Sequence, residues 1–500
     1  MEGHAQKQRR FHGEDQVNGE DRISVLPDSL IHHILSFLPA DVIMKTSLLS
    51  QRWKDLWTSV HSLDFSGAIS MEEEYFMFRF LCNYLTNYKG SKLFKFRANF
   101  YYKEAKDLFV DFLLFFVKMH SIEELDLHLS ARFWDYFNGR NLKNYTVKLQ
   151  SCLFDCRELR VLRLSCFDLK EHACISFRYL KVLDLRLANF EYLDISGCPL
   201  LEDLRLVDCN FMSTLNLHAP NTKLRNLKIV DSNTEWGEGG RIIRAPHVLF
   251  IDITGDLRPS YDMKDLSSVI RVRLDFSEML DIVQSPESYD AFMMLMNLIV
   301  NVSHAKTLKL CRSCITVLSY VKELKWDIPH FATSCLEVES IFNERELVGL
   351  ANILGSAPCL EFLTLNIGYL SSWCSWKKYK NYPRSETWEL VEIVLPTFLC
   401  TVKTITINNL FRNMHISNGI ESANTVDEIL EVIDEEIKLV KYLLKISNML
   451  KKMVIIISHE TTLLYSTSDF LTSITRKLLH LPRTSLNAEI NVSYGKPQQV

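Results

Sequence analysis

The chain has 500 residues, enough for several domains or one long repeat array, because a single hydrophobic core stops growing at about 250–300 residues. Hydrophobic residues make up 47% and charged residues 24%, and the formal net charge of −4 gives no indication of binding to nucleic acid or to an anionic membrane. The longest apolar run, LFVDFLLFFVKM, is broken by Asp111 and Lys118 and is shorter than the roughly 20 apolar residues that span a bilayer. We therefore expect no membrane segment.

Residues 1–20 are polar and lack the apolar core of a secretory signal, which predicts a disordered leader. The chain has 13 cysteines, an odd number without the regular spacing of a disulfide framework. Scattered cysteines of this kind indicate reduced thiols, so we expect a protein of the cytoplasm and/or the nucleus.

The stretch LPDSLIHHILSFLPADVIMKTSLLSQRWKDLWTSV, residues 26–60, predicts three short helices. Pro27 and Asp28 suit the first turn of a helix whose apolar stripe continues to Leu38. A second helix is expected over about residues 42–47, and a third should carry Trp53 and Trp57 on one face. A unit this small has more apolar side chains than it can bury alone. The remainder either packs on the rest of the chain or forms a docking surface.

The pattern DRISVLPDSLIHHILSFLP…TSLLSQRWKDLW…LDF closely resembles the plant-type F-box over about residues 21–66, and it departs from that family at ADVIMK, where a charged helix start is more usual. The resemblance implies that the spare apolar surface binds a SKP-type adaptor, which links F-box proteins to a cullin–RING ubiquitin ligase. Aromatic anchors usually contribute most of the affinity of such a surface. By position, the resemblance implies the contact residues Leu26, Pro27, Ile34, Leu35, Leu38, Leu49, Trp53 and Trp57.

Past residue 66 the sequence alternates predicted helices, about 71–88 and 104–119, with the extended segments KLFKF and IEELDLHL. A leucine-rich pattern, L-x-x-L-x-L, then recurs from Leu159, Leu180, Leu201, Leu224, Val248 and Val269, at spacings of 21, 21, 23, 24 and 21 residues. Further copies begin at Ala305 and Leu360. One copy alone would indicate an ordinary buried strand, but a period held this long predicts a solenoid. The longer later spacings leave room for helices over residues 288–302 and 344–355.

The phrases SGCPLLEDLRL and GSAPCLEFLTL resemble the plant F-box leucine-rich-repeat family. Near the C-terminus a strand, TVKTITI, is expected before a long helix over about 426–451, which has a capping-box signature at Thr425 and Glu428 and a stripe that includes Ile429, Ile433, Ile437, Val440 and Leu444. A strand, MVIII, follows. The section LPTFLCTVKTITI…EEIKLVKYLLKISNMLKKMVII resembles the FBD domain that ends many plant F-box proteins, with about 20 residues inserted after the first strand.

The expected fold is α/β: a small N-terminal three-helix F-box, a leucine-rich-repeat solenoid, and an FBD-like strand–helix–strand unit that caps the solenoid. We place the leader at residues 1–20, the F-box at 21–66, the solenoid at 67–383, the FBD-like domain at 384–470 and a C-terminal segment at 471–500.

Signs of catalysis or of a metal site are weak. Cys311 and Cys314 form a C-x-x-C, but no second pair stands at zinc-site spacing. No G-x-S-x-G, phosphate-binding loop or other nucleophile motif occurs in the sequence. We therefore expect no enzyme, no cofactor and no metal. The leading hypothesis is the substrate-recognition subunit of an SCF-type (SKP–cullin–F-box) ubiquitin ligase, and the alternative is a scaffold or interaction protein, with or without the adaptor, that has no role in ubiquitin transfer.

Charge on the open face of the repeats suggests what a target looks like. In L-x-x-L-x-L the leucines point into the core, so the residue between the last two faces outward. Along the chain this position holds Arg163, Asp184, Arg205, Lys228, Asp252, Arg273, Lys309 and Thr364. Neighbouring charges of opposite sign can satisfy one another. The excess of basic residues alternatively predicts that Arg163, Arg205, Lys228, Arg273 and Lys309 bind an acidic or phosphorylated segment of a target.

Overall fold

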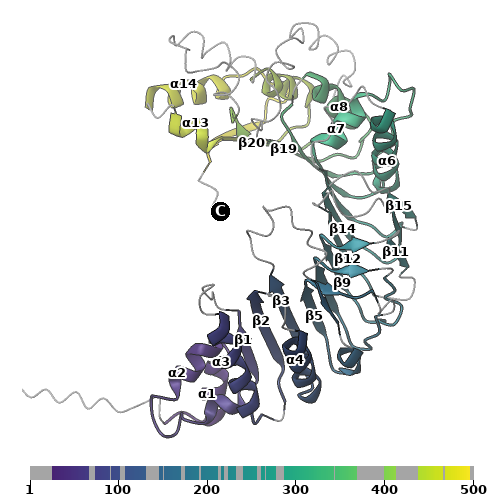
Figure 1. The fold of residues 1–500 in the computed structure, drawn as a ribbon. Helices are drawn as coiled ribbons and strands as arrows, with labels where there is room; N and C mark the ends of the chain where they lie inside the picture. Colours follow the sequence, from purple (N-terminus) through teal and green to yellow (C-terminus); the bar gives the residue numbers. More distant parts are fainter. Residues whose placement is uncertain are drawn as a thin grey trace, which may run out of the picture.

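A computed structural model gives the chain a mixed α/β fold, drawn in Figure 1. It describes residues 25–495 except for 67–73, 91, 102–106, 131–145, 150, 171–174, 191–192, 212–214, 219–222, 232–239, 256–260, 265, 277–285, 343, 369–398, 413–436 and 465–467. Within the described residues, no helix is both long enough and apolar enough to cross a membrane.

The largest element is a 15-stranded sheet. Its strands follow one another in chain order, and every neighbouring pair is parallel. The strands are β1 (Ser62–Phe65), β2 (Lys95–Tyr101), β3 (Glu124–Ser130), β5 (Val161–Ser165), β7 (Val182–Arg186), β9 (Asp203–Val207), β12 (Asn226–Asp231), β14 (Phe250–Gly255), β16 (Arg271–Phe276), β17 (Thr307–Leu310), β18 (Cys335–Ser340), β19 (Phe362–Ile367), β20 (Thr404–Leu410), β21 (Lys452–Ile457) and β22 (Glu489–Tyr494).

The sheet bends into an arc and lines its concave side, as Figure 1 shows. The chain returns between strands on the convex side, through short strands or through helices. The short strands form two small sheets. One contains β4 (Val147–Lys148), β6 (Phe167–Asp168), β8 (Asn189–Phe190) and β10 (Asn210–Phe211), and the other contains β11 (Leu215–His218), β13 (Arg241–Arg244) and β15 (Tyr261–Lys264).

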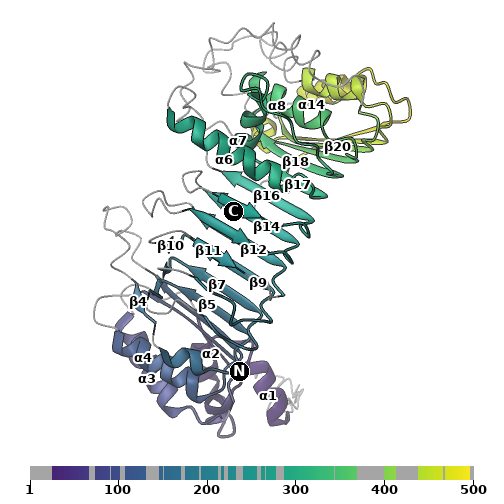
Figure 2. The ribbon, with the colours of Figure 1, turned by 90° about the vertical axis from the view of Figure 1, so that its right-hand side faces the viewer.

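Helices take over the returns at both ends of the arc (Figure 2). They are α3 (Glu74–Asn87), α4 (Asp107–Met119), α6 (Pro286–Val302), α7 (Arg312–Ser319), α8 (Glu344–Gly355), α13 (His459–Leu464) and α14 (Ser468–Leu479), with a short 3₁₀ helix, η4 (Ser151–Asp155). The helix predicted over residues 344–355 is confirmed. Parallel strands need such crossovers because consecutive strands must start from the same edge of the sheet.

Along each strand of the large sheet, buried side chains alternate with side chains that face the concave surface. In β5, Leu162 and Leu164 are buried, whereas Arg163 between them faces the concave side. The same pattern repeats through the sheet, and one continuous hydrophobic core extends from Ile31 in the first helix to Ile490 in the last strand.

The N-terminal unit contains α1 (Asp28–Leu35), α2 (Ala40–Thr46) and a 3₁₀ helix, η1 (Leu56–Ser59). The third α-helix predicted around Trp53 and Trp57 is wrong, because the chain forms turns and η1 there. Backbone carbonyls that an α-helix would use internally bond to other elements instead. The Tyr84 hydroxyl donates to the Trp57 carbonyl at 3.0 Å, and the Lys89 amide donates to the Thr58 carbonyl at 2.7 Å.

At the C-terminus the predicted strands TVKTITI and MVIII are confirmed as β20 and β21. Residues 437–446 are helical, and Ile437, Val440 and Leu444 are buried as expected. Thr425, Glu428, Ile429 and Ile433 lie outside the described residues. Helix α14 and strand β22, which the sequence analysis left as an unassigned C-terminal segment, add one more strand to the sheet.

Candidate functional site

Large apolar side chains stand exposed on the N-terminal unit. Leu30 is 48% exposed, Ile34 44%, Phe37 74%, Leu48 87% and Leu49 64%. The first three follow the helical period along α1 and the turn after it, and the other two follow α2. We call these five side chains the docking patch. Five large exposed apolar side chains within a segment of 20 residues indicate an interaction surface.

Asp28 and Arg52 connect the two halves of this unit. The Arg52 Nε donates to Asp28 Oδ1 at 3.2 Å, which ties the segment after α2 to the start of α1. The opposite face of α1 carries Ile31 and Leu35, which are fully buried in the core of the chain. Part of the apolar surplus therefore packs on the rest of the protein, and part of it faces outward.

The eight residues predicted to contact the adaptor divide into three groups. Pro27, Ile34 and Leu49 are exposed, and Leu26, Leu38 and Trp57 are half-buried. Leu35 and Trp53 are 0% and 4% exposed, so their assignment to the contact surface is corrected: they support the surface from beneath. Leu30, Phe37 and Leu48 were not predicted as contact residues, because a wide apolar stripe does not show which of its edges the chain itself covers.

The second candidate site is a row of charges on the concave face of the sheet. Strand register places one residue from each of eleven successive strands side by side. We call this row the charged ladder: Asp64, Arg97, Asp126, Arg163, Asp184, Arg205, Lys228, Asp252, Arg273, Lys309 and Glu337. Seven of these were predicted from the repeat pattern, whereas Asp64, Arg97, Asp126 and Glu337 were not. Six members are basic and five acidic, so the predicted basic excess is corrected to a near balance.

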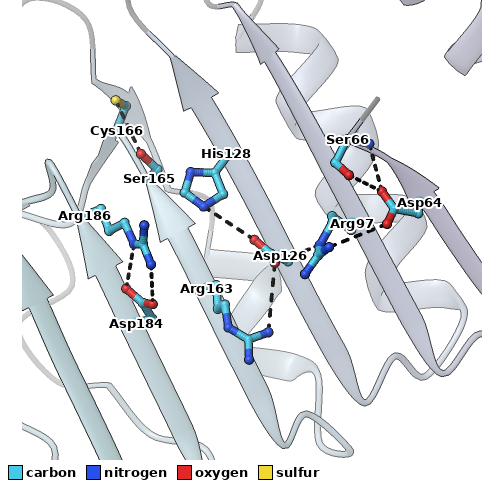
Figure 3. A network of polar contacts seen from close by, with 10 residues as sticks. All are labelled: Asp64, Ser66, Arg97, Asp126, His128, Arg163, Ser165, Cys166, Asp184 and Arg186. Carbon is cyan, nitrogen blue, oxygen red and sulfur yellow. Dashed lines mark hydrogen bonds and ion pairs between the residues drawn. The ribbon is translucent and has the colours of Figure 1, made fainter. Parts of the chain in front are cut away.

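Asp126 is the hub of the N-terminal part of the ladder, shown in Figure 3. Its Oδ2 accepts a hydrogen bond from Arg97 Nε at 3.1 Å and lies 3.9 Å from Arg163 Nη1. Its Oδ1 lies 3.8 Å from His128 Nε2. Asp126 is only 5% exposed, so Arg97 and Arg163 compensate a buried carboxylate. Burial lowers the pKa of His128 below its usual value.

Asp184, two strands further on, is held by its own strand (Figure 3). The Arg186 guanidinium donates to Asp184 Oδ1 and Oδ2, each at 3.0 Å, and this bidentate bond raises the pKa of Arg186. Asp184 is 1% exposed, so a paired partner is required there.

Short ion pairs hold the other basic members predicted to bind a target. Lys228 Nζ lies 2.9 Å from Asp252, and Lys309 Nζ lies 2.6 Å from Glu337. Arg273 donates to Asp275 at 2.6 Å. Arg205 differs from all of these: it is exposed, and no described residue forms an ion pair or side-chain hydrogen bond with it. The structure thus distinguishes members of a group that the sequence treats as equivalent.

Cys311 and Cys314 lie at the N-terminal end of α7, with their sulfur atoms 3.9 Å apart. Both are buried, and the Cys311 Sγ accepts a hydrogen bond from the Phe276 amide at 3.2 Å. Interaction with Cys314 lowers the pKa of the Cys311 thiol, whereas burial raises the pKa of Cys314. Throughout the described residues, no group of three or more histidine, cysteine or acidic side chains could hold a metal ion. The two surfaces described above suit binding of other proteins.

Comparison with known proteins agrees with the N-terminal geometry. The F-box domain family matches residues 23–65. An F-box/LRR-repeat protein of Arabidopsis thaliana is 24% identical over 400 residues, which cover 76% of this chain and 80% of that protein. An FBD-associated F-box protein of the same plant is 27% identical over 458 residues, covering 87% and 92%, and an F-box/FBD/LRR-repeat protein is 29% identical over 243 residues, covering 47% and 51%. The chain therefore carries an F-box domain at residues 23–65 and is a homologue of plant F-box/LRR-repeat and F-box/FBD/LRR-repeat proteins.

Proposed function

We propose that this protein is the substrate-recognition subunit of an SCF-type ubiquitin ligase. In this proposal the F-box docks on a SKP-type adaptor and through it on a cullin–RING ligase, while the concave sheet holds a target protein. The observation that carries the proposal is the docking patch, five exposed apolar side chains within a segment that the F-box family matches. A surface of this kind is unfavourable in water and gains stability when a partner covers it.

We infer that the sheet and its returns form a leucine-rich-repeat solenoid. Strands in chain order, parallel pairing and returns on one side support this assignment. In the same proposal β20, β21 and the helix between them form an FBD-like unit that continues the stack and covers the core beyond β19. A continuous sheet would hold the docking patch and the concave face in a fixed geometry.

The mechanism in this proposal is proximity. The ligase brings its ubiquitin donor close to a bound target and so raises the effective concentration of one beside the other. The chain itself needs no nucleophile, cofactor or metal for this role. We also propose a cytoplasmic and/or nuclear location, which is supported by 11 cysteines among the described residues that form no disulfide bond.

The test is capture of a purified SKP-type adaptor by the full chain. Phe37→Glu should reduce adaptor binding at least about thirtyfold, because losing a central anchor costs about 2 kcal/mol or more. Leu486, which is 90% exposed but lies near the C-terminus, offers a matched control, and Leu486→Glu should bind normally. Trp53→Ala should also weaken binding, but through loss of packing beneath the patch, so its melting temperature should fall as well.

Adaptor binding by Phe37→Glu at the level of the unaltered chain would refute the docking patch. A second assay separates the ligase from the scaffold alternative: the adaptor, cullin and RING subunits should copurify with the chain, and its captured proteins should accumulate under proteasome inhibition. Copurification without any such accumulation would favour the scaffold.

A further inference from the structure

The acidic and basic members of the charged ladder nearly balance, so excess positive charge can occur only where the two signs do not alternate. From Asp64 to Arg205 acidic and basic members alternate strictly from strand to strand. Two breaks follow, each with two cations side by side: Arg205 beside Lys228, and Arg273 beside Lys309. Like charges on neighbouring strands destabilise a sheet unless an anion lies between them.

At the second break, carboxylates of the chain itself pair with both cations. Arg273 donates to Asp275 at 2.6 Å and lies 3.9 Å from Asp252, and Lys309 pairs with Glu337 at 2.6 Å. Neither cation is available without breaking an existing pair.

At the first break, no carboxylate of the described residues pairs with Arg205. The carboxylate beside Arg205 belongs to Asp184, and both of its oxygens accept hydrogen bonds from Arg186. On the other side, Lys228 pairs with Asp252, on the strand further from Arg205, at 2.9 Å. Arg205 is exposed and has no ion-pair or hydrogen-bond partner among the described residues. The ladder thus presents a free guanidinium next to an ammonium group that already has a partner on its other side.

We propose that the strand pair β9–β12 binds an anionic side chain of the target, a carboxylate or a phosphate on an extended peptide segment, through Arg205 assisted by Lys228. This inference rests on the proposed function, in which the concave face holds the target. The planar guanidinium can donate two parallel hydrogen bonds to an oxyanion, and the neighbouring ammonium adds charge. Val207 and Val230 lie two residues further along the same strands, half-buried and in register, so an apolar side chain of the segment can pack beside the anion.

The ladder also fixes where the anion binds. One strand away on either side stand Asp184 and Asp252, which would repel an anion placed there. About ten extended residues reach about 33 Å and cross about seven strands at their spacing of about 4.8 Å. A segment of that length therefore has one favourable position for a negative side chain near the middle of the ladder.

The experiment uses the full chain and three sets of fluorescent peptides of about ten residues. The peptides within a set vary in sequence, but the three sets are identical except at two positions, which hold glutamate, phosphoserine or glutamine. We expect one or both anionic sets to bind at least about tenfold more tightly than the glutamine set, as one charge-assisted bond provides. Arg205→Gln should remove that preference, and Arg205→Lys should restore part of it. Arg178→Gln, the same change in an exposed turn outside the sheet, should leave it intact.

The carboxylate and phosphate sets identify the source of the anion. Equal binding of all three sets, or an Arg205→Gln variant that keeps the preference, would overturn the proposal, as would tighter binding of a single-stranded RNA of the same charge. Adaptor capture is measured on the same variants and should not change. If the unaltered chain captures no adaptor but still prefers the anionic peptides, the proposed ligase role is refuted and this site stands.

Discussion

Neutralising Asp126 tests whether the buried part of the charged ladder stabilises the sheet. Asp126 is 5% exposed and compensates Arg97 at 3.1 Å and Arg163 at 3.9 Å. Removing one member of a buried ion pair costs about 3–5 kcal/mol, because the partner is left without compensation. The cost should be lower here. Arg97 keeps Asp64 at 3.6 Å, and about a third of each arginine side chain is exposed to water. We expect Asp126→Asn to lower the free energy of unfolding by about 2 kcal/mol.

The assay is urea-induced unfolding, combined with hydrogen exchange of the backbone amides of β2, β3 and β5, because a repeat array need not unfold in one step. Asp64→Asn serves as the control. Asp64 is 31% exposed, and its ion pair is long, so its loss should cost less than about 1 kcal/mol. The double variant Asp126→Asn with Arg163→Gln should regain part of the loss, since it removes an uncompensated cation.

If Asp126→Asn destabilises the chain no more than Asp64→Asn does, Asp126 does not stabilise the sheet through buried charge compensation. If Arg163→Gln makes the Asp126→Asn variant less stable still, Arg163 contributes something other than charge compensation, which contradicts the prediction.

Two further changes test the packing of the array. Gly349→Ala should lower the melting temperature despite the better helix propensity of alanine, because its Cβ would lie 2.0 Å from the Ile315 carbonyl oxygen on the neighbouring helix, whereas Gly368→Ala, with its nearest atom at 3.7 Å, should be nearly neutral. Equal melting temperatures would contradict this. Removing residues 396–500 takes β20 away from β19 and uncovers the core, so the remainder should be insoluble; a soluble fragment 1–395 with one cooperative melt would contradict it.

The sequence predicted the elements whose periodicity is strong. The L-x-x-L-x-L copies that begin at Leu159 to Val269 coincide with β5, β7, β9, β12, β14 and β16. The predicted bounds of α8, residues 344–355, agree with the structure at both ends. The prediction was wrong where the same spacing of apolar residues is compatible with more than one backbone conformation. The stripe with Trp53 and Trp57 fits an α-helix by spacing, but hydrogen bonds from Tyr84 and Lys89, which lie far along the chain, fix the carbonyls of this segment in another geometry.

The charged ladder shows what a repeat search omits. Thr333 stands where the pattern has its first leucine, three residues before Leu336, so the copy that contains Glu337 was not predicted although Leu336 and Val338 are buried like the other core residues. Asp64, Arg97 and Asp126 were missed because their strands precede the regular period. Strand register places each of these strands in the sheet, so acidic and basic members of the ladder could be counted only once all strands were placed.

The two proposed surfaces stand in a fixed relation that bears on the ligase hypothesis. Residues of α1 and α2 pack in the same continuous core as the strands, so the docking patch cannot swing freely against the sheet. Between β1, next to the patch, and β9, which carries Arg205, the sheet has five strand steps, or about 24 Å at about 4.8 Å a step. A target anchored at Arg205 would therefore be held within a narrow range of distances from a bound adaptor. Proximity raises an effective concentration most when the geometry suits the distance to be spanned, so the continuous core serves the proposed function as directly as either surface does.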